Sequence, residues 1–169
     1  ITQQMVKLTL VQQAKNKEER LAATDDTYAR KWRELQYALA IEEQHSKDWI
    51  LERYLNIALF GDGAYGVQAA ARHFFDRNAQ RLSLRQSALL AGLVRNPEGY
   101  DPVKNPAEAL ERRNVVLQRM ADLDVITQAE ADRVKKMDLG LNVQEEDNGC
   151  LDAVHQFYCD YVLAYLYQD

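Results

Sequence analysis

The chain has 169 residues, of which 21 are basic and 26 acidic, so its net charge at pH 7 is −5. This length suffices for one domain with a sizeable core, and an apolar fraction of 47% is typical of folded rather than disordered proteins. The negative charge argues against a protein whose whole surface binds nucleic acid, and no stretch approaches the ~20 apolar residues of a membrane span.

Residues 1–14 are predicted to form a helix. Apolar residues recur at helical spacing at Ile1, Met5 and Leu8. The remaining surface carries Gln3, Gln4 and Lys7, two carboxamides and an ammonium group, which suit a sugar-phosphate ligand. Composition alone favours the plainer interpretation of these three residues, an ordinary solvated face.

Residues 15–27 are charged and contain few large apolar groups. We interpret this segment as a mobile loop. Its length lies in the range where loops tend to be functional lids rather than simple connections.

Residues 28–44 are predicted to form a long helix. Its core-facing stripe is expected to consist of Tyr28, Trp32, Leu35 and Leu39. Arg30 and Lys31 precede Glu34 by four and three residues, so both cations can lie beside this carboxylate. Two neighbouring cations favour ionised Glu34, which suits ligand positioning better than general-base chemistry. The alternative is a surface salt-bridge cluster that contributes little.

Helix-capping signals divide the rest of the chain. Ser46 begins a helix that ends before a glycine-rich turn, and residues 67–75 form a short alanine-rich helix. Ser83 opens a capping box, Pro106 stands at the first position of another helix, and Thr127 opens a second capping box. Two-residue alternation is nowhere sustained. The predicted fold class is therefore all-α, with many helices.

The helical pattern lapses over residues 138–148, which we interpret as a linker or a domain edge. Cys150 and Cys159 follow it. Two cysteines could pair in an oxidising compartment and would stay reduced in the cytosol. The three histidines match no metal-ligand spacing, so no metal site is predicted from the side chains.

Several motifs, in order along the chain, resemble the signatures of one enzyme family. Ile1-Thr2-Gln3-Gln4-x-x-Lys7 resembles the second signature of the family 51 glycosyltransferases, the peptidoglycan polymerase domains of class A penicillin-binding proteins. Arg30-Lys31-x-x-Glu34 resembles the third. The later motifs that agree are Ser46-Lys47-x-x-Ile50-Leu51-x-x-Tyr54-Leu55-Asn56, Phe60-Gly61, Gly63-Ala64-Tyr65-Gly66, Leu89-Leu90-Ala91-Gly92-Leu93, Asn96-Pro97, Asn105-Pro106 and Arg112-Arg113-Asn114-x-Val116-Leu117-x-x-Met120.

The resemblance covers residues 1–137 and implies a lysozyme-like helical glycosyltransferase domain. Residues 138–169 would begin the passage to a transpeptidase domain. The implied enzyme polymerises lipid II into glycan strands, with inversion at the anomeric carbon, at the extracytoplasmic face of the bacterial cytoplasmic membrane. Its implied partners are lipid II, the growing strand, the membrane surface, other cell-wall synthesis proteins and moenomycin-type inhibitors.

The resemblance also assigns roles to residues. Gln3, Gln4 and Lys7 would hold the sugar and diphosphate of the donor, and residues 12–27 would form a flap over it. Arg30 and Lys31 would neutralise the diphosphate. Glu34 would be a second active-site carboxylate, and Asn56 would support the cleft. Cations or a divalent metal, Mg²⁺ or Mn²⁺, would offset the charge on the leaving group.

Two departures from the family pattern stand out. The first signature, which holds the catalytic base, is expected upstream of Ile1, so the chain as written is expected to be inactive alone. Leu59 occupies a position where many family members have Tyr. A non-catalytic envelope scaffold that keeps the fold is the alternative function, and a lysozyme-like hydrolase is a third. The extracytoplasmic location implied by the family favours a Cys150–Cys159 disulfide.

Overall fold

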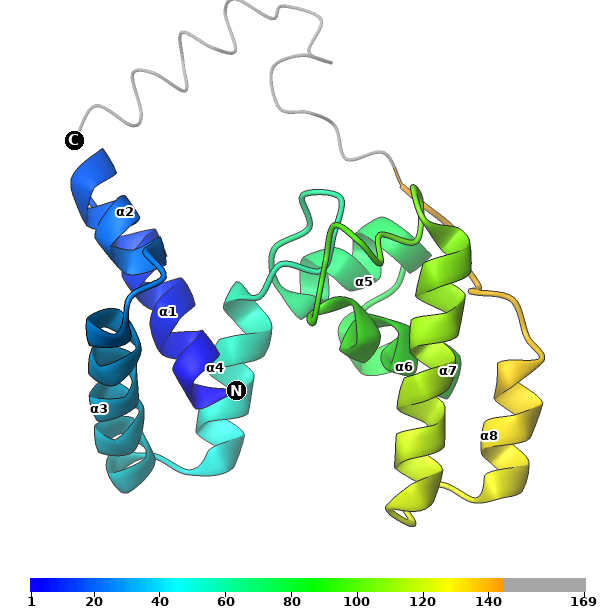
Figure 1. Cartoon of the computed structure of the whole chain (residues 1–169). Coiled ribbons are helices and arrows are strands. Elements are labelled where there is room, and N and C mark those ends of the chain that lie inside the picture. The colour runs from blue at the N-terminus through cyan, green and yellow to red at the C-terminus, as the bar shows by residue number, and fades with distance from the viewer. Residues whose placement is uncertain (145–169) are drawn as a thin grey trace, which may run out of the picture.

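The structure is a computed structural model, and it describes residues 1–144. Over this range the chain forms eight α-helices and one 3-10 helix (Figure 1). Their bounds are α1 Thr2–Gln13, α2 Lys17–Thr24, α3 Tyr28–Gln44, α4 Lys47–Ile57, α5 Val67–Phe75, η1 Ala79–Arg81, α6 Leu84–Leu93, α7 Pro106–Asp122 and α8 Gln128–Lys135. The predicted all-α class is confirmed, since the β-structure within these residues is one isolated bridge between Leu59 and Tyr65.

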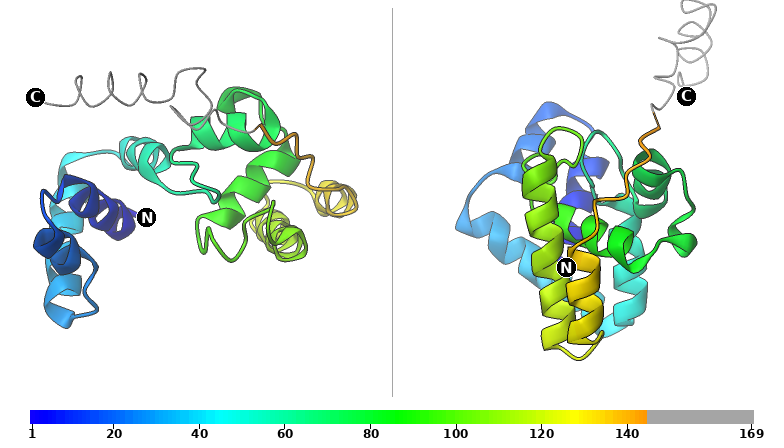
Figure 2. Two further views of the ribbon diagram at one scale, coloured as in Figure 1. Left: turned by 90° about the horizontal axis from the view of Figure 1, so that it is seen from above. Right: turned by 90° about the vertical axis from the view of Figure 1, so that its right-hand side faces the viewer.

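The helices lie in two groups that meet at α4. Helices α1, α2 and α3 lie on one side, α5 to α8 lie on the other, and α4 packs against α1 (Figures 1 and 2). One hydrophobic core nevertheless includes residues of both groups, among them Met5 of α1, Tyr54 of α4, Phe74 of α5 and Leu89 of α6. None of the described helices has the length and apolar character needed to cross a bilayer.

The caps predicted from the sequence are present. The side chain of Ser46 accepts a hydrogen bond from the amide of Trp49, at 3.2 Å, and α4 begins there. Ser83 and Thr127 each form a complete capping box, and Pro106 stands at the start of α7. These boundaries are local, because each cap satisfies amides of its own first turn.

The expected loop over residues 15–27 contains a helix, so that prediction is wrong for residues 17–24. Asn16 caps α2 by accepting a hydrogen bond from the amide of Glu19 at 2.8 Å. Glu18 and Glu19 lie in the first turn, where negative charge is favourable. The charged residues of this segment are good helix formers, so charge was a poor criterion for a loop.

The predicted core-facing stripe of α3 is also wrong. Its members are largely exposed, with side chains that face away from the other helices. The exposed set is Tyr28, Trp32, Leu35 and Leu39. The buried residues of α3 are Arg30, Glu34 and Ala38, which lie four residues apart on the opposite face. A charged pair thus takes the inward positions that aromatic residues were expected to fill.

A tight turn joins α4 to α5 and contains the glycines of the predicted motif. Gly66 has a φ of +88°, and a Cβ placed on it would lie 2.9 Å from the carbonyl oxygen of Asn56. Gly63 has a φ of +76° and open space around it. Glycine at position 66 is therefore required both by the backbone angle and by the approach of α4.

Arg113 of α7 binds the backbone at and just after the C-terminal end of α8. It is fully buried, and its guanidinium donates to the carbonyls of Lys135, Met137 and Asp138 at 3.2, 2.9 and 2.5 Å. Burial and then the charge of Arg85 lower the pKa of Arg113, while Asp138 opposes them. The interaction satisfies carbonyls that a helix end would leave without donors.

Residues 138–144 run along the domain. The amides of Asn142 and Gln144 donate to the carbonyls of Phe74 and His73 at 2.8 and 2.7 Å. The proposed domain boundary at residue 138 stays a prediction. The expected Cys150–Cys159 disulfide lies outside the described residues.

Candidate substrate site

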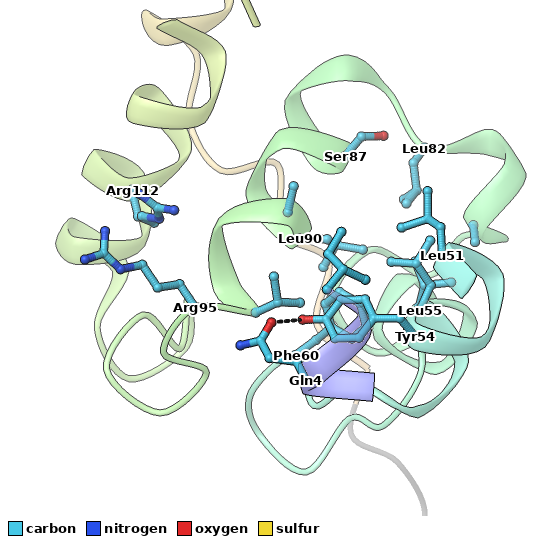
Figure 3. A pocket seen from close by; sticks show the side chains of 15 residues that line it. Gln4, Leu51, Tyr54, Leu55, Phe60, Leu82, Ser87, Leu90, Arg95 and Arg112 are labelled. Atoms are coloured by element: carbon cyan, nitrogen blue, oxygen red, sulfur yellow. Dashed lines mark hydrogen bonds between the residues drawn. The ribbon is translucent and has the colours of Figure 1, made fainter. Parts of the chain in front are cut away.

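The polar face predicted on α1 is present. Gln3 and Gln4 are exposed and Lys7 is half-buried, while Met5 and Val6 face the core. The hydroxyl of Tyr54 on α4 donates to Oε1 of Gln4 across 3.5 Å (Figure 3). Burial raises the pKa of Tyr54, so its hydroxyl keeps its proton.

Arg30 and Glu34 form a buried ion pair within α3. Nη1 of Arg30 donates to Oε1 of Glu34, and the two side chains are 9% and 8% exposed. Nε of Arg30 donates to the carbonyl of Asp25, just before the helix. The spacing therefore identified a real contact, and its burial excludes the alternative of a surface pair.

Lys31 is directed to a different carboxylate. Its ammonium lies 2.8 Å from Oδ1 of Asp26 rather than beside Glu34. Nη2 of Arg30 lies 3.9 Å from the same oxygen. The hydrogen bond and charge of Lys31, followed by the charges of Arg30 and Lys7, lower the pKa of Asp26. Residues Lys7, Arg30, Lys31, Glu34 and Asp26, called here the charged cluster, bring two predicted motifs together.

A cleft of about 600 Å³ lies next to Gln4. Apolar side chains of α4 and α6, such as Leu51 and Leu90, line one side of it, and Arg95 and Arg112 lie across from them (Figure 3). A cleft with an apolar lining and a few cationic groups suits an amphiphile with an anionic head. Lys7 and the α3 residues do not line this cleft.

Asn56 lies apart from both features. It occupies the last turn of α4 with an exposed side chain, and its carbonyl faces Gly66. Its contribution in this structure is therefore a backbone contact, and its predicted role in supporting the cleft stays a prediction.

The charged cluster offers no ligand set for a metal ion. Within residues 1–144 there is no group of three or more His, Cys, Asp and Glu that could hold one. Glu34 and Asp26 are each engaged by cations, which disfavours a second positive charge on the same oxygens. The divalent cation expected at the diphosphate of the donor stays a prediction.

Comparison with known proteins agrees with this arrangement. The model of the Transglycosylase family matches residues 1–121, a span that includes both polar motifs and the cleft. The chain belongs to the Transglycosylase family. It is 42% identical over 112 residues to penicillin-binding protein 2D of Bacillus subtilis. It is 43% identical over 108 residues to a putative transglycosylase of Cupriavidus necator.

The fold comparison leads to the same family. The crystal structure of penicillin-binding protein 1A from Haemophilus influenzae matches 98% of this chain with a TM-score of 0.52 and 25% sequence identity. The match covers 19% of that protein. The matched segments cover 16% of the B. subtilis protein and 47% of the C. necator protein, and 66% and 64% of this chain.

Asp26 is the charged-cluster residue that sequence reasoning missed. It precedes α3 in a non-helical connection, so helical spacing rules do not place it beside Lys31. The available signal was the acidic pair Asp25-Asp26 immediately before a helix that opens with Arg30 and Lys31.

Proposed function

We propose that this chain is the donor-side part of a peptidoglycan glycosyltransferase that polymerises lipid II into glycan strands with inversion. Membership of the Transglycosylase family carries the proposal. The charged cluster supports it, because Lys7, Arg30 and Lys31 gather positive charge beside the polar face of α1.

In the proposed reaction, the 4-hydroxyl of the acceptor sugar attacks the anomeric carbon of the growing strand. The bond from that carbon to the lipid diphosphate breaks, and the diphosphate leaves with the electron pair. A base takes the hydroxyl proton. Lysine and arginine side chains that hold the diphosphate stabilise the charge that grows on it, which lowers the barrier.

Glu34 is poorly placed to be that base. Its carboxylate is buried and accepts a hydrogen bond from Arg30, so it serves best by holding the guanidinium in place. The base would belong to the first signature of the family. A divalent cation, if the reaction uses one, would arrive on the diphosphate oxygens.

We also propose that the domain works against the extracytoplasmic membrane surface, where the lipid tail of the donor is held. The exposed side chains of Tyr28, Trp32 and Leu39 support this, because they form an apolar stripe along α3 that is 92%, 62% and 56% exposed. Aromatic residues of this kind are suited to the interface between lipid and water. The growing strand and other cell-wall synthesis proteins are the proposed partners, and moenomycin-type compounds the proposed inhibitors.

The test is polymerisation of labelled lipid II by this chain and by the same chain extended to its natural N-terminus. Activity only in the extended form is expected. In that form, Lys7→Ala and Lys31→Ala should abolish polymerisation, whereas Lys136→Ala, an exposed lysine after α8, should not. Inactivity of the extended form, together with no binding of lipid II, would favour the scaffold instead.

A further inference from the structure

Asp26 is the exposed carboxylate of the charged cluster. Its Oδ1 lies 2.8 Å from the ammonium of Lys31 and 3.9 Å from Nη2 of Arg30. A carboxylate oxygen and a phosphate oxygen are interchangeable partners for these cations, since both accept charge-assisted hydrogen bonds. A ligand phosphate and Asp26 must therefore compete for Lys31.

The competing contact is an easily exchanged one. The side chains of Asp26 and Lys31 are 84% and 56% exposed, so neither must be moved out of a packed core. Glu34, in contrast, is buried and bound to Arg30, and it stays in place when the outer contact changes. At 3.9 Å, Nη2 of Arg30 is too far from Asp26 for a hydrogen bond, so Lys31 makes the direct contact with this carboxylate.

The charges of the cluster indicate how strong the competition is. Three cations face two carboxylates, which leaves one net positive charge while Asp26 is ionised. Without the charge on Asp26 the net charge doubles. A diphosphate, which carries at least two negative charges, then meets a more positive site and no longer approaches a fixed anion.

We propose that Asp26 is an affinity-determining residue that holds Lys31 between turnovers and gives way to the donor diphosphate. By competing for Lys31, it weakens binding of both donor and released lipid diphosphate, and it thereby speeds product release. The inference rests on the proposed function, because it assumes that the charged cluster binds a diphosphate.

The test measures the affinity for inorganic pyrophosphate of the wild-type chain and of three variants, Asp26→Asn, Asp25→Asn and Lys31→Ala. Binding is monitored by ¹H–¹⁵N NMR shifts at low ionic strength. Asp26→Asn is expected to bind about two- to five-fold more tightly than wild type, the range expected for an exposed ion pair. Asp25→Asn is the matched control. It removes the same charge at the neighbouring residue, whose side chain forms no ion pair with the charged cluster. The gain should shrink at high salt.

The outcomes separate this proposal from the proposed function. Tighter binding by Asp26→Asn than by Asp25→Asn supports the competition. Equal binding by the two, or weaker binding by Asp26→Asn, overturns it, and loss of binding in Lys31→Ala would then still support a diphosphate site. If the wild-type chain and every variant fail to bind pyrophosphate, both the competition and the donor-side function are refuted.

Discussion

The buried pair of Arg30 and Glu34 allows a quantitative test of how the site is held together. Arg30→Met keeps most of the aliphatic stem and removes the guanidinium, which leaves the Glu34 carboxylate buried without its cation. Breaking a buried pair in this way costs about 3–5 kcal/mol. A domain of this kind has a total stability of about 5–15 kcal/mol, so the loss is a large part of it.

Urea unfolding followed by circular dichroism measures this loss, and thermal unfolding should show a midpoint lower by roughly 6–20 °C. Adding Glu34→Leu removes the orphaned charge, so the double variant should recover most of the lost stability, with a coupling energy of about 2–3 kcal/mol. Lys31→Met is the control on the same helix and should unfold close to wild type, because its side chain is 56% exposed. If Arg30→Met and Lys31→Met unfold alike, or the double variant is no more stable than Arg30→Met, the pair does not stabilise the fold as argued.

Three further predictions concern parts of the fold that position the site. Gly66→Ala should lower the free energy of unfolding by about 2–4 kcal/mol, because the positive φ and the close approach of α4 both oppose a Cβ. Gly63→Ala has a positive φ but open space around it, so it should lower the free energy of unfolding by only about 1 kcal/mol in the same urea titration. Arg113→Met should cost about 3–5 kcal/mol, because three carbonyls at the end of α8 lose a charged donor; an unchanged unfolding midpoint would contradict this. A hydrogen bond from Lys104 lowers the pKa of Asp62, so the stability it adds is complete above the ordinary carboxyl pKa of about 4 and is lost as the pH falls through the lowered pKa of the folded protein. The stability difference between wild type and Asp62→Asn should therefore shrink steadily as the pH falls below about 4, and Asn suits the φ of +47° at this turn; a difference that is the same at pH 2 as at pH 6 would refute the assignment.

The parts of the fold that the sequence predicted are those governed by local rules. Ser46, Ser83 and Thr127 cap the helices that they were expected to cap, because a cap needs only its own first turn. The contact of Arg30 with Glu34 also follows from spacing along one helix. Which face of α3 is buried depends on the helices that pack against it. The face with the aromatic residues was predicted to be buried, but it is exposed.

The candidate site was predictable only in part for the same reason. Family motifs located Lys7 and Arg30, and α1 packing against α3 brings them into one cluster. Asp26 lies in the connection after α2, and the charged residues of α2 had led us to predict a loop there. Asp26 could therefore be placed beside Lys31 only once the path of the chain between α2 and α3 was known.

Because α1 packs against α4, part of its native packing can form only after α4 has been synthesised. Gln4 of α1 and its partner Tyr54 are 50 residues apart. At a synthesis rate of about 5–20 residues per second, α1 exists for roughly 2.5–10 s before Tyr54 has been made. During that interval Met5 and Val6, which end up buried, have no native partner on α4. Helix α1 therefore remains without this packing partner until α4 has been synthesised.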